Sequence, residues 1–308
     1  MPSKQEALQP DALEPDTLES EPQDRSAEWV SGLDELDRVP VTETRLGRVG
    51  AGLWAATWPK VLALALVIAA WQVIFELELK PAWTLPAPLT VWEDLSSFVV
   101  TAEFWTAIRI TMWRALTTFA LALAVGTVLG IAVARFKPLR AAIGSLITGL
   151  QTMPSIMWFP LAILLFQISE SAIAFVVVLG AVPSIANGLI SGIDYVPKEW
   201  RRVGAILGMR GLTLYRHVIL PATLPSYVSG LKQGWAFAWR SLMAGELLVI
   251  VAGQGSIGAL MQGAREFNNA PRVLTWIIVV LLIGIAVDAI FRTADSRIKR
   301  KWGLAEVR

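Results

Sequence analysis

The chain offers few side chains that could do covalent chemistry or bind a metal. It has no cysteine and one histidine, His217, in 308 residues. Thiolate nucleophiles and cysteine zinc sites are therefore excluded, and one imidazole cannot build a histidine-rich metal centre or a choice of general bases. Within the long apolar segments, Glu246 and Asp288 are the available carboxylates, too few for a clustered acid–base site. We expect no catalytic residue, no cofactor and no metal.

Five polar residues stand out because apolar sequence surrounds them. An ionised side chain at the centre of a bilayer costs about 2.5–3.5 kcal/mol, so Arg240 and Glu246 should face protein or water. Gln233 lies seven residues before Arg240 and shares its face of a helix. Together with Gln151 and Asn187, these residues are candidates for a translocation pathway. The alternatives are a structural ion pair or a snorkelling end residue for the charges, and support of kinked backbone for the amides.

The elements that carry these residues are long apolar segments. The chain is 55% hydrophobic and 17% charged, with a mean hydropathy of +0.55, which indicates a membrane protein. Interfacial tryptophans and flanking Lys and Arg bound several of the segments. We therefore predict an all-α polytopic membrane protein with about six transmembrane helices, at 61–75, 115–134, 141–166, 172–193, 225–251 and 273–290.

Proline and charge predict irregularities in these spans. Pro154 and Pro160 interrupt the third span, which should be kinked, and Pro183 predicts another break in the fourth. The fifth span contains Lys232, Arg240 and Glu246, so its hydropathy should be lower than that of the others. Residues 88–108 are amphipathic and suggest an external surface helix.

Charge divides the chain into regions. Residues 1–43 hold 12 acidic and 3 basic side chains. A segment so acidic and so poor in aromatic residues predicts a disordered acidic tail over 1–50, before a transmembrane domain over 51–303 and a short tail over 304–308. Lys and Arg gather in alternate loops, which by the positive-inside rule places both termini and the loop 197–221 in the cytoplasm. The location is then the cytoplasmic membrane.

The loop 197–221 differs from the others because it is long, basic and amphipathic. Ala205, Ile206 and Met209 fit one short helix, Gly211 a turn, and residues 214–220 a second short helix that stops at Pro221. The loop is therefore predicted to be a helix–turn–helix on the cytoplasmic face. His217 lies within it and is interpreted as solvated.

Over roughly residues 84–303 the chain resembles the binding-protein-dependent ABC importer permeases, in the nitrate, taurine and aliphatic-sulfonate branch. The family's cytoplasmic loop has Glu-Ala-Ala, a glycine six residues after the Glu, and Leu-Pro thirteen after the glycine. Gly208 and Leu220-Pro221 match this spacing. Further matches are the segments LPAP at 85–88, MPSIMWFPLAILLF at 153–166, Ala238-Trp239 and Gly245-Glu246.

The loop departs from the family at its first motif. Arg202-Val203-Gly204 stands where Glu-Ala-Ala is expected, and the nearest acidic residue is Glu199, one helical turn earlier. The residues that the resemblance assigns to coupling with an ATPase are Glu199, Trp200, Arg202, Gly204, Gly208, Leu220 and Pro221. Trp200 could equally be a membrane-surface ring.

The resemblance implies a type I importer permease fold and a set of partners: a second permease copy in a homodimer, two ATP-binding subunits, an extracytoplasmic solute-binding protein and the lipid bilayer, with no nucleic acid. No lysine follows a glycine in the chain, so the Gly-Lys-Ser/Thr phosphate-binding pattern is absent and the ATPase must be another chain. The implied substrate is a small anion, an aliphatic sulfonate, taurine or nitrate. The alternatives are a stand-alone secondary transporter or channel, and a membrane-embedded enzyme.

Overall fold

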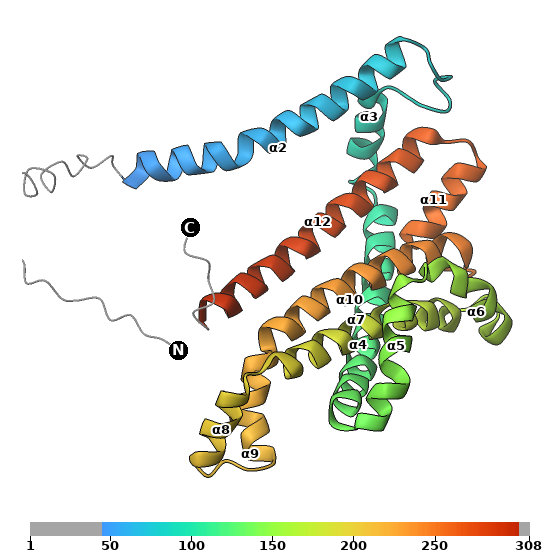
Figure 1. Cartoon of the computed structure of the whole chain (residues 1–308). Helices are drawn as coiled ribbons and strands as arrows, with labels where there is room; N and C mark the ends of the chain where they lie inside the picture. Colours follow the sequence, from blue (N-terminus) through green and yellow to red (C-terminus); the bar gives the residue numbers. More distant parts are fainter. Residues whose placement is uncertain (1–44, 302–308) are drawn as a thin grey trace, which may run out of the picture. The chain divides into compact units, whose positions relative to one another are not determined.

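The computed structural model describes residues 45–301, so most of the predicted acidic tail and the short tail at 304–308 lie outside the described residues. The chain divides into two compact units, residues 1–67 and 68–308. Residues 45–67, the described part of the first unit, belong to helix α2 (Arg45–Glu76), whose apolar stretch includes the first predicted span (Figure 1). Every regular element among residues 45–301 is helical.

The core of the second unit is built on three long helices, α4 (Ala102–Arg135), α7 (Glu170–Tyr195) and α10 (Leu220–Leu248). α7 packs against both of the others and supplies many of the buried apolar side chains. Small residues permit this close packing: a Cβ added to Gly188 of α7 would lie 2.6 Å from the Cα of Gly230 on α10. The central helix is therefore held by backbone approach as well as by apolar side chains.

A second cluster joins the helices that follow and precede the core. α3 (Pro88–Phe98) packs on α12 (Ala270–Lys301), where Trp276 is fully buried against Phe98 and Phe104. An ion pair of 2.9 Å between Asp94 on α3 and Arg272 on α12 supports the same packing. α11 (Ile257–Glu266) contacts α12 and α10.

The third predicted span is bent, as its prolines indicated. It consists of α5 (Lys137–Thr152), the 3-10 turn η1 (Ser155–Trp158) and α6 (Phe159–Phe166), with an angle of 107° between its two arms. Pro154 caps the 3-10 turn and Pro160 lies in the first turn of α6, where a missing N–H costs little.

Three boundary predictions were wrong. α7 is one continuous helix through Pro183, because the dense packing on both sides of this helix holds the backbone where lipid could not. Residues 88–108 are not one helix: α3 ends at Phe98, and Thr101, which accepts a hydrogen bond from the N–H of Phe104, caps the start of α4. Pro221 does not stop a helix but lies in the first turn of α10.

Four helices are long and apolar enough to cross a membrane, and the bent α5–α6 pair brings the number to five in the described part of the chain. α10, with 29 residues, has the length for a sixth span. It is not among the helices that are apolar enough to cross a membrane by composition, as expected from the polar residues that the sequence places in it.

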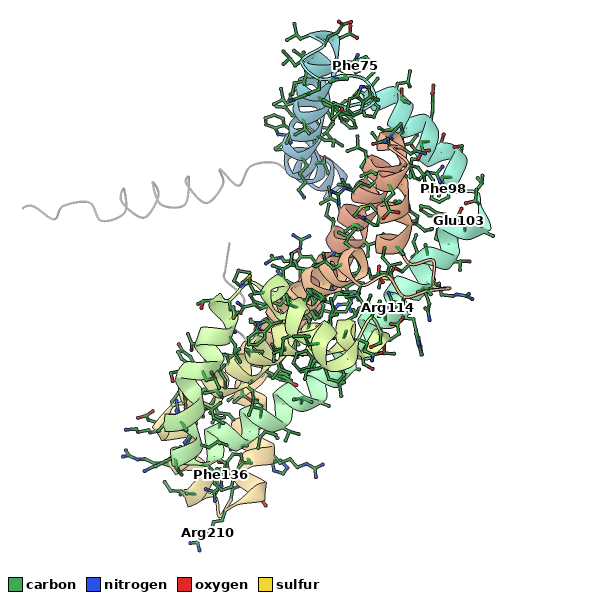
Figure 2. All side chains as sticks on the ribbon, turned by 90° about the vertical axis from the view of Figure 1, so that its right-hand side faces the viewer. Phe75, Phe98, Glu103, Arg114, Phe136 and Arg210 are labelled. Atoms are coloured by element: carbon green, nitrogen blue, oxygen red, sulfur yellow. The ribbon has the colours of Figure 1, made fainter. Side chains whose placement is uncertain are left out.

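The second unit has two distinct ends. Figure 2 shows Arg210 and Phe136, the C-cap of α4, at one end, with Glu103 and Phe98 toward the other and Arg114 between them. The short helix α8 (Lys198–Ile206) lies with α9 (Leu212–Leu214) at the first end, and α11 lies toward the other (Figure 1). Arg210 belongs to one candidate site, at the first end, and Arg114, between the two ends, belongs to the other.

Candidate functional site

A buried ionic cluster joins the three helices α4, α10 and α11, and Glu246 is its centre. This carboxylate on α10 is 1% exposed. It accepts a hydrogen bond of 2.5 Å from Nη1 of Arg114 on α4, hydrogen bonds of 3.1 and 2.9 Å from Oγ1 of Thr111, and one of 3.0 Å from the backbone N–H of Gly258 on α11. These donors satisfy a charge that would otherwise be costly to bury. We call Thr111, Arg114, Glu246 and Gly258 the Glu246 cluster.

The start of α11 is shaped to fit this carboxylate. Ser256 caps the helix by accepting a hydrogen bond from the N–H of Ala259, and the N–H groups of Ile257 and Gly258 donate to partners outside the helix. The N–H of Ile257 donates to Thr111 over 3.0 Å, and that of Gly258 donates to Glu246. A Cβ on Gly258 would lie 2.3 Å from the Cβ of Glu246, so only glycine permits this approach. The positive end of the α11 dipole adds to the stabilisation of the carboxylate.

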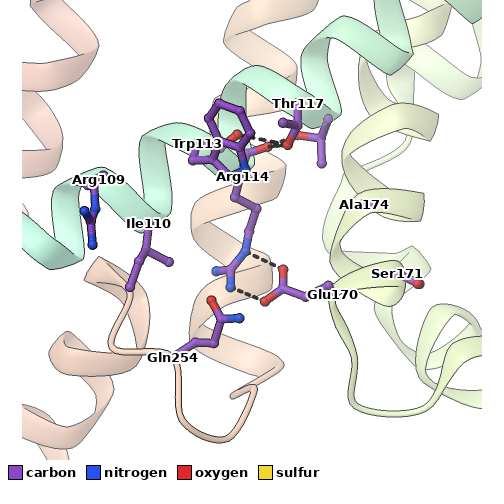
Figure 3. Close-up of a pocket in the computed structure, with 10 residues that line it drawn as sticks. Arg109, Ile110, Trp113, Arg114, Thr117, Glu170, Ser171, Ala174 and Gln254 are labelled. Atoms are coloured by element: carbon purple, nitrogen blue, oxygen red, sulfur yellow. Dashed lines mark hydrogen bonds and ion pairs between the residues drawn. The ribbon is translucent and has the colours of Figure 1, made fainter.

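Arg114 also binds Glu170, the first residue of α7. Its Nε and Nη2 donate to the two carboxylate oxygens over 2.6 and 2.5 Å, a bidentate pair (Figure 3). The arginine side chain is 7% exposed, whereas that of Glu170 is 43% exposed. The pair borders a cavity of about 580 Å³. Its lining residues are Arg109, Ile110, Trp113, Arg114, Thr117, Thr118, Glu170, Ser171, Ala174 and Gln254.

A polar stripe follows the exposed face of α10. Ser229, Gln233 and Arg240 are all exposed and, at offsets of four and seven residues, lie near one face of the helix. Arg240 forms no ion pair with any of residues 45–301, and its guanidinium carbon lies 5.9 Å from the ring centroid of Phe237. A stripe of this kind on a membrane helix requires water or another protein surface beside it.

The loop between α7 and α10 is a helix–turn–helix, formed by residues 198–219. α8 ends before Gly208 and Gly211, whose φ angles of +78° and +54° favour glycine. The chain then returns through α9 and the π-helical turn η2 (Tyr215–Ile219) into α10. The two arms touch at Gly204, where an added Cβ would lie 2.5 Å from Cδ1 of Leu214.

The outer face of this helix–turn–helix is both apolar and basic. Trp200, Val203, Ile206 and Leu207 are exposed, with Ile206 84% exposed. Exposed basic side chains surround them: Lys198, Arg202, Arg210 and Arg216. A surface of this composition is typical of a protein interface, in which apolar side chains become buried and charges select the partner.

The remaining sequence-predicted residues occupy varied positions. Gln151 on α5 donates a hydrogen bond of 3.0 Å to Oγ of Ser184 on α7 and so braces the bent span. Asn187 is half-buried on α7, and Glu199 is exposed on α8. Leu220 is exposed and Pro221 half-buried at the start of α10. Glu246 is buried in an ion pair, whereas Arg240 and Gln233 are exposed on one stripe.

Sequence reasoning did not find Thr111, Arg114 and Glu170 as site residues. Arg114 directly precedes the second predicted span, and Glu170 lies between the third and the fourth. In the sequence, Arg114 is 56 residues from Glu170 and 132 residues from Glu246. One signal was present: a buried Glu246 needs a cation, and Arg114 is the basic residue nearest the outer end of the second span.

Comparison with known proteins places these features in a family. Residues 126–300, more than half of the chain, match the model of the binding-protein-dependent transport system inner membrane component. The chain is 28% identical over 265 residues to SsuC of Bacillus subtilis, a permease protein named for aliphatic sulfonates, covering 86% of this chain and 95% of that one. It is 25% identical to the taurine transport system permease protein TauC of Escherichia coli, covering 76% of this chain and 86% of that one.

Two further similarities agree. The nitrate import permease protein NrtB of Synechocystis is 25% identical, over 77% of this chain and 89% of that protein. The solved structure of the MetNI methionine ABC transporter in an inward-facing conformation matches with a TM-score of 0.50 at 18% identity, covering 64% of this chain and 96% of the matched chain. The structural match concerns the fold, which is that of an all-α polytopic importer permease. The chain belongs to the family of binding-protein-dependent transport system inner membrane components.

Proposed function

We propose that this chain is the permease subunit of an ATP-driven importer that moves a small anion across the cytoplasmic membrane. Relatives over most of its length are named for aliphatic sulfonates, taurine and nitrate, and these are the candidate substrates. The partners are a second copy of this chain, two ATP-binding subunits and an extracytoplasmic solute-binding protein. Both termini and the helix–turn–helix lie in the cytoplasm, in agreement with the alternation of basic loops.

The observation that carries the proposal is the exposed surface of residues 198–219 in a member of this family. The arms of this helix–turn–helix contact each other at Gly204 and Leu214, and Trp200 and Ile206 remain 51% and 84% exposed. An ATPase that binds there can move α10 directly, because η2 continues into that helix. Alternating access then follows from ATP-driven approach of the two loops in the dimer.

The polar stripe on α10 supports a pathway beside this helix. In a dimer, two such stripes can face a shared aqueous passage, and Arg240 would supply positive charge there for a passing anion. Gln233 and Arg240, which lie on this stripe, are the proposed pathway residues. Glu246, whose oxygens are engaged by Arg114, Thr111 and Gly258, instead serves the structure around it.

The test is to purify the full chain from its native membranes and ask whether a polypeptide with the Gly-Lys-Ser/Thr pattern copurifies and hydrolyses ATP. The double variant Trp200→Ala/Ile206→Ala should lose this partner. Phe267→Ala, which removes a side chain that is 86% exposed just after α11, should retain it. Copurification that survives the double variant, or ion-driven uptake by the chain alone in liposomes, contradicts the proposal.

A further inference from the structure

Arg114 is held by two carboxylates that differ in how firmly they are fixed. The side chain of Glu246 is fully buried and has three donors, from Arg114, Thr111 and Gly258. Glu170 is 43% exposed, and within residues 45–301 its carboxylate bonds to Arg114 alone. Water can solvate Glu170 when it leaves, whereas Glu246 has no such alternative. Glu170 is therefore the exchangeable partner.

The edge of Arg114 that Glu170 occupies suits other oxyanions. Nε and Nη2 lie side by side and each donates to one carboxylate oxygen, at 2.6 and 2.5 Å. Sulfonate and nitrate groups also present two oxygens to such a planar fork. The same edge can accept either group once Glu170 has moved away.

Charge around the cavity favours a single anion. Arg109 is exposed on the cavity wall and forms no ion pair among the described residues. With Glu170 in place, the two arginines and the two glutamates balance. Displacement of Glu170 leaves Arg109 and Arg114 with Glu246, a formal charge of one positive unit, which a monovalent anion neutralises. Gln254, which Figure 3 shows beside the Arg114–Glu170 pair, can donate a further hydrogen bond.

The remaining lining of the cavity suits a short organic tail. Ile110, Trp113 and Ala174 contribute apolar surface beside the arginines, and a volume of about 580 Å³ is ample for a small organic molecule. Nitrate would use the arginines and leave this surface empty. An alkanesulfonate would use both, so the cavity favours an amphipathic anion.

We infer that Arg114 is an anion seat in which Glu170 is the resident carboxylate and a short-chain organic sulfonate is the ligand that displaces it. The inference rests on the proposed function for its substrate class and adds a site to it. Because Glu170 is the first residue of α7, its release also removes an ion pair that joins the start of the central helix to α4. Ligand occupancy is thereby linked to the packing of α4 and α7.

The experiment measures binding of propanesulfonate to the purified full chain in lipid nanodiscs by titration calorimetry. Glu170→Gln should tighten binding about tenfold, as expected if Glu170 fills the seat about nine-tenths of the time. The matched control is Asp194→Asn, which removes a carboxylate of similar exposure (41%) from its pair with Arg140 elsewhere and should leave binding unchanged. Nitrate should bind more weakly than propanesulfonate to the wild type and to Glu170→Gln.

Arg109→Gln should weaken propanesulfonate binding several-fold without disturbing the Glu246 cluster. Arg114→Gln should abolish binding, but it also removes a partner of Glu246, so Glu170→Gln and Arg109→Gln decide the matter if that variant does not fold. Unchanged or weaker binding in Glu170→Gln, or no binding in either this variant or the wild type, overturns the inference. If the permease copurifies with its ATPase but gives one of these negative binding results, the anion seat at Arg114 is refuted and the proposed importer function is not. Normal binding without an ATPase partner refutes the importer.

Discussion

The Glu246 cluster and the helix–turn–helix of residues 198–219 place charge and apolar surface in opposite ways. In the cluster a carboxylate is buried and accepts hydrogen bonds from Thr111, Arg114 and Gly258. In the helix–turn–helix apolar side chains such as Ile206 are exposed and the basic residues around them lie on the surface. The first region is completed by the chain's own residues. The second presents an exposed apolar and basic surface to which we propose that another protein binds. Mutations should therefore affect folding in the Glu246 cluster and assembly in the helix–turn–helix.

The largest loss of stability is expected at the centre of the cluster. Glu246→Ala leaves Arg114 with one exposed partner and leaves the N–H of Gly258 without an acceptor. Breaking a buried ion pair in this way should lower the free energy of unfolding by about 3–5 kcal/mol. Thermal unfolding in detergent measures the effect. Asp194→Asn, in a half-exposed pair, should lower it by about 1 kcal/mol or less, and equal losses would contradict the contrast.

The next largest effect tests the fit of α11 against the cluster. In Gly258→Ala the new methyl group meets Glu246 at 2.3 Å, so the helix must shift, at a cost of about 1–3 kcal/mol in the free energy of unfolding. Gly263, on the same helix, has open space around its Cβ position. Gly263→Ala should therefore be neutral or stabilising, by up to about 1 kcal/mol. The same unfolding measurement serves both, and a stable Gly258→Ala protein would show that the cluster is loosely packed.

A smaller effect is expected where the helix–turn–helix closes on itself. In Gly204→Ala the methyl group meets the flexible end of Leu214, so the strain should be about 1 kcal/mol and local. The side chain of Arg210 is already exposed, and local opening should make the backbone around it more accessible, which speeds cleavage there by trypsin. Adding Leu214→Ala should cancel the effect of the alanine at 204. If cleavage is no faster than in the wild type, the two arms do not depend on this contact.

The smallest change in stability is expected at Arg240. This exposed side chain has no ion pair in the described part of the chain, so Arg240→Gln should alter the free energy of unfolding by less than about 0.5 kcal/mol. Uptake of propanesulfonate into liposomes with the ATPase and binding protein should nevertheless fall sharply. Lys232→Gln, which removes another cation of α10 and its 3.1 Å ion pair with Asp288 on α12, is the control and should transport normally. Normal uptake by Arg240→Gln would remove this residue from the pathway.

Much of the fold could be predicted from the sequence because the bilayer constrains it. The helical class, the positions of the apolar spans and the bend at Pro154 and Pro160 all follow from local composition. The continuity of α7 through Pro183 could not be predicted, since it depends on the neighbours that pack on both sides. The local sequence shows that Pro183 removes a backbone hydrogen bond, but it does not show that α4 and α10 pack on either side and support the helix.

The site was predictable in part for a similar reason. Glu246 was identified as a charge that needs a partner, and Arg240 and Gln233 as members of one helix face. The partner Arg114 was not identified, because its contact spans 132 residues and depends on how α4 and α10 cross. Nor could periodicity show that Glu170 would complete the pair from the start of α7.

α10 is one unbroken helix from the helix–turn–helix to the Glu246 cluster. Its 29 residues correspond to about 43 Å at 1.5 Å per residue. The turn η2 (Tyr215–Ile219) runs directly into this helix, and a hydrogen-bonded helix changes little in length. A displacement of residues 215–219 along the helix axis should therefore also displace Glu246 and its partner Arg114. α10 thus connects the exposed helix–turn–helix with the buried Glu246 cluster through one continuous helix, which gives a partner bound at residues 198–219 a direct structural route to the ion pairs of Arg114.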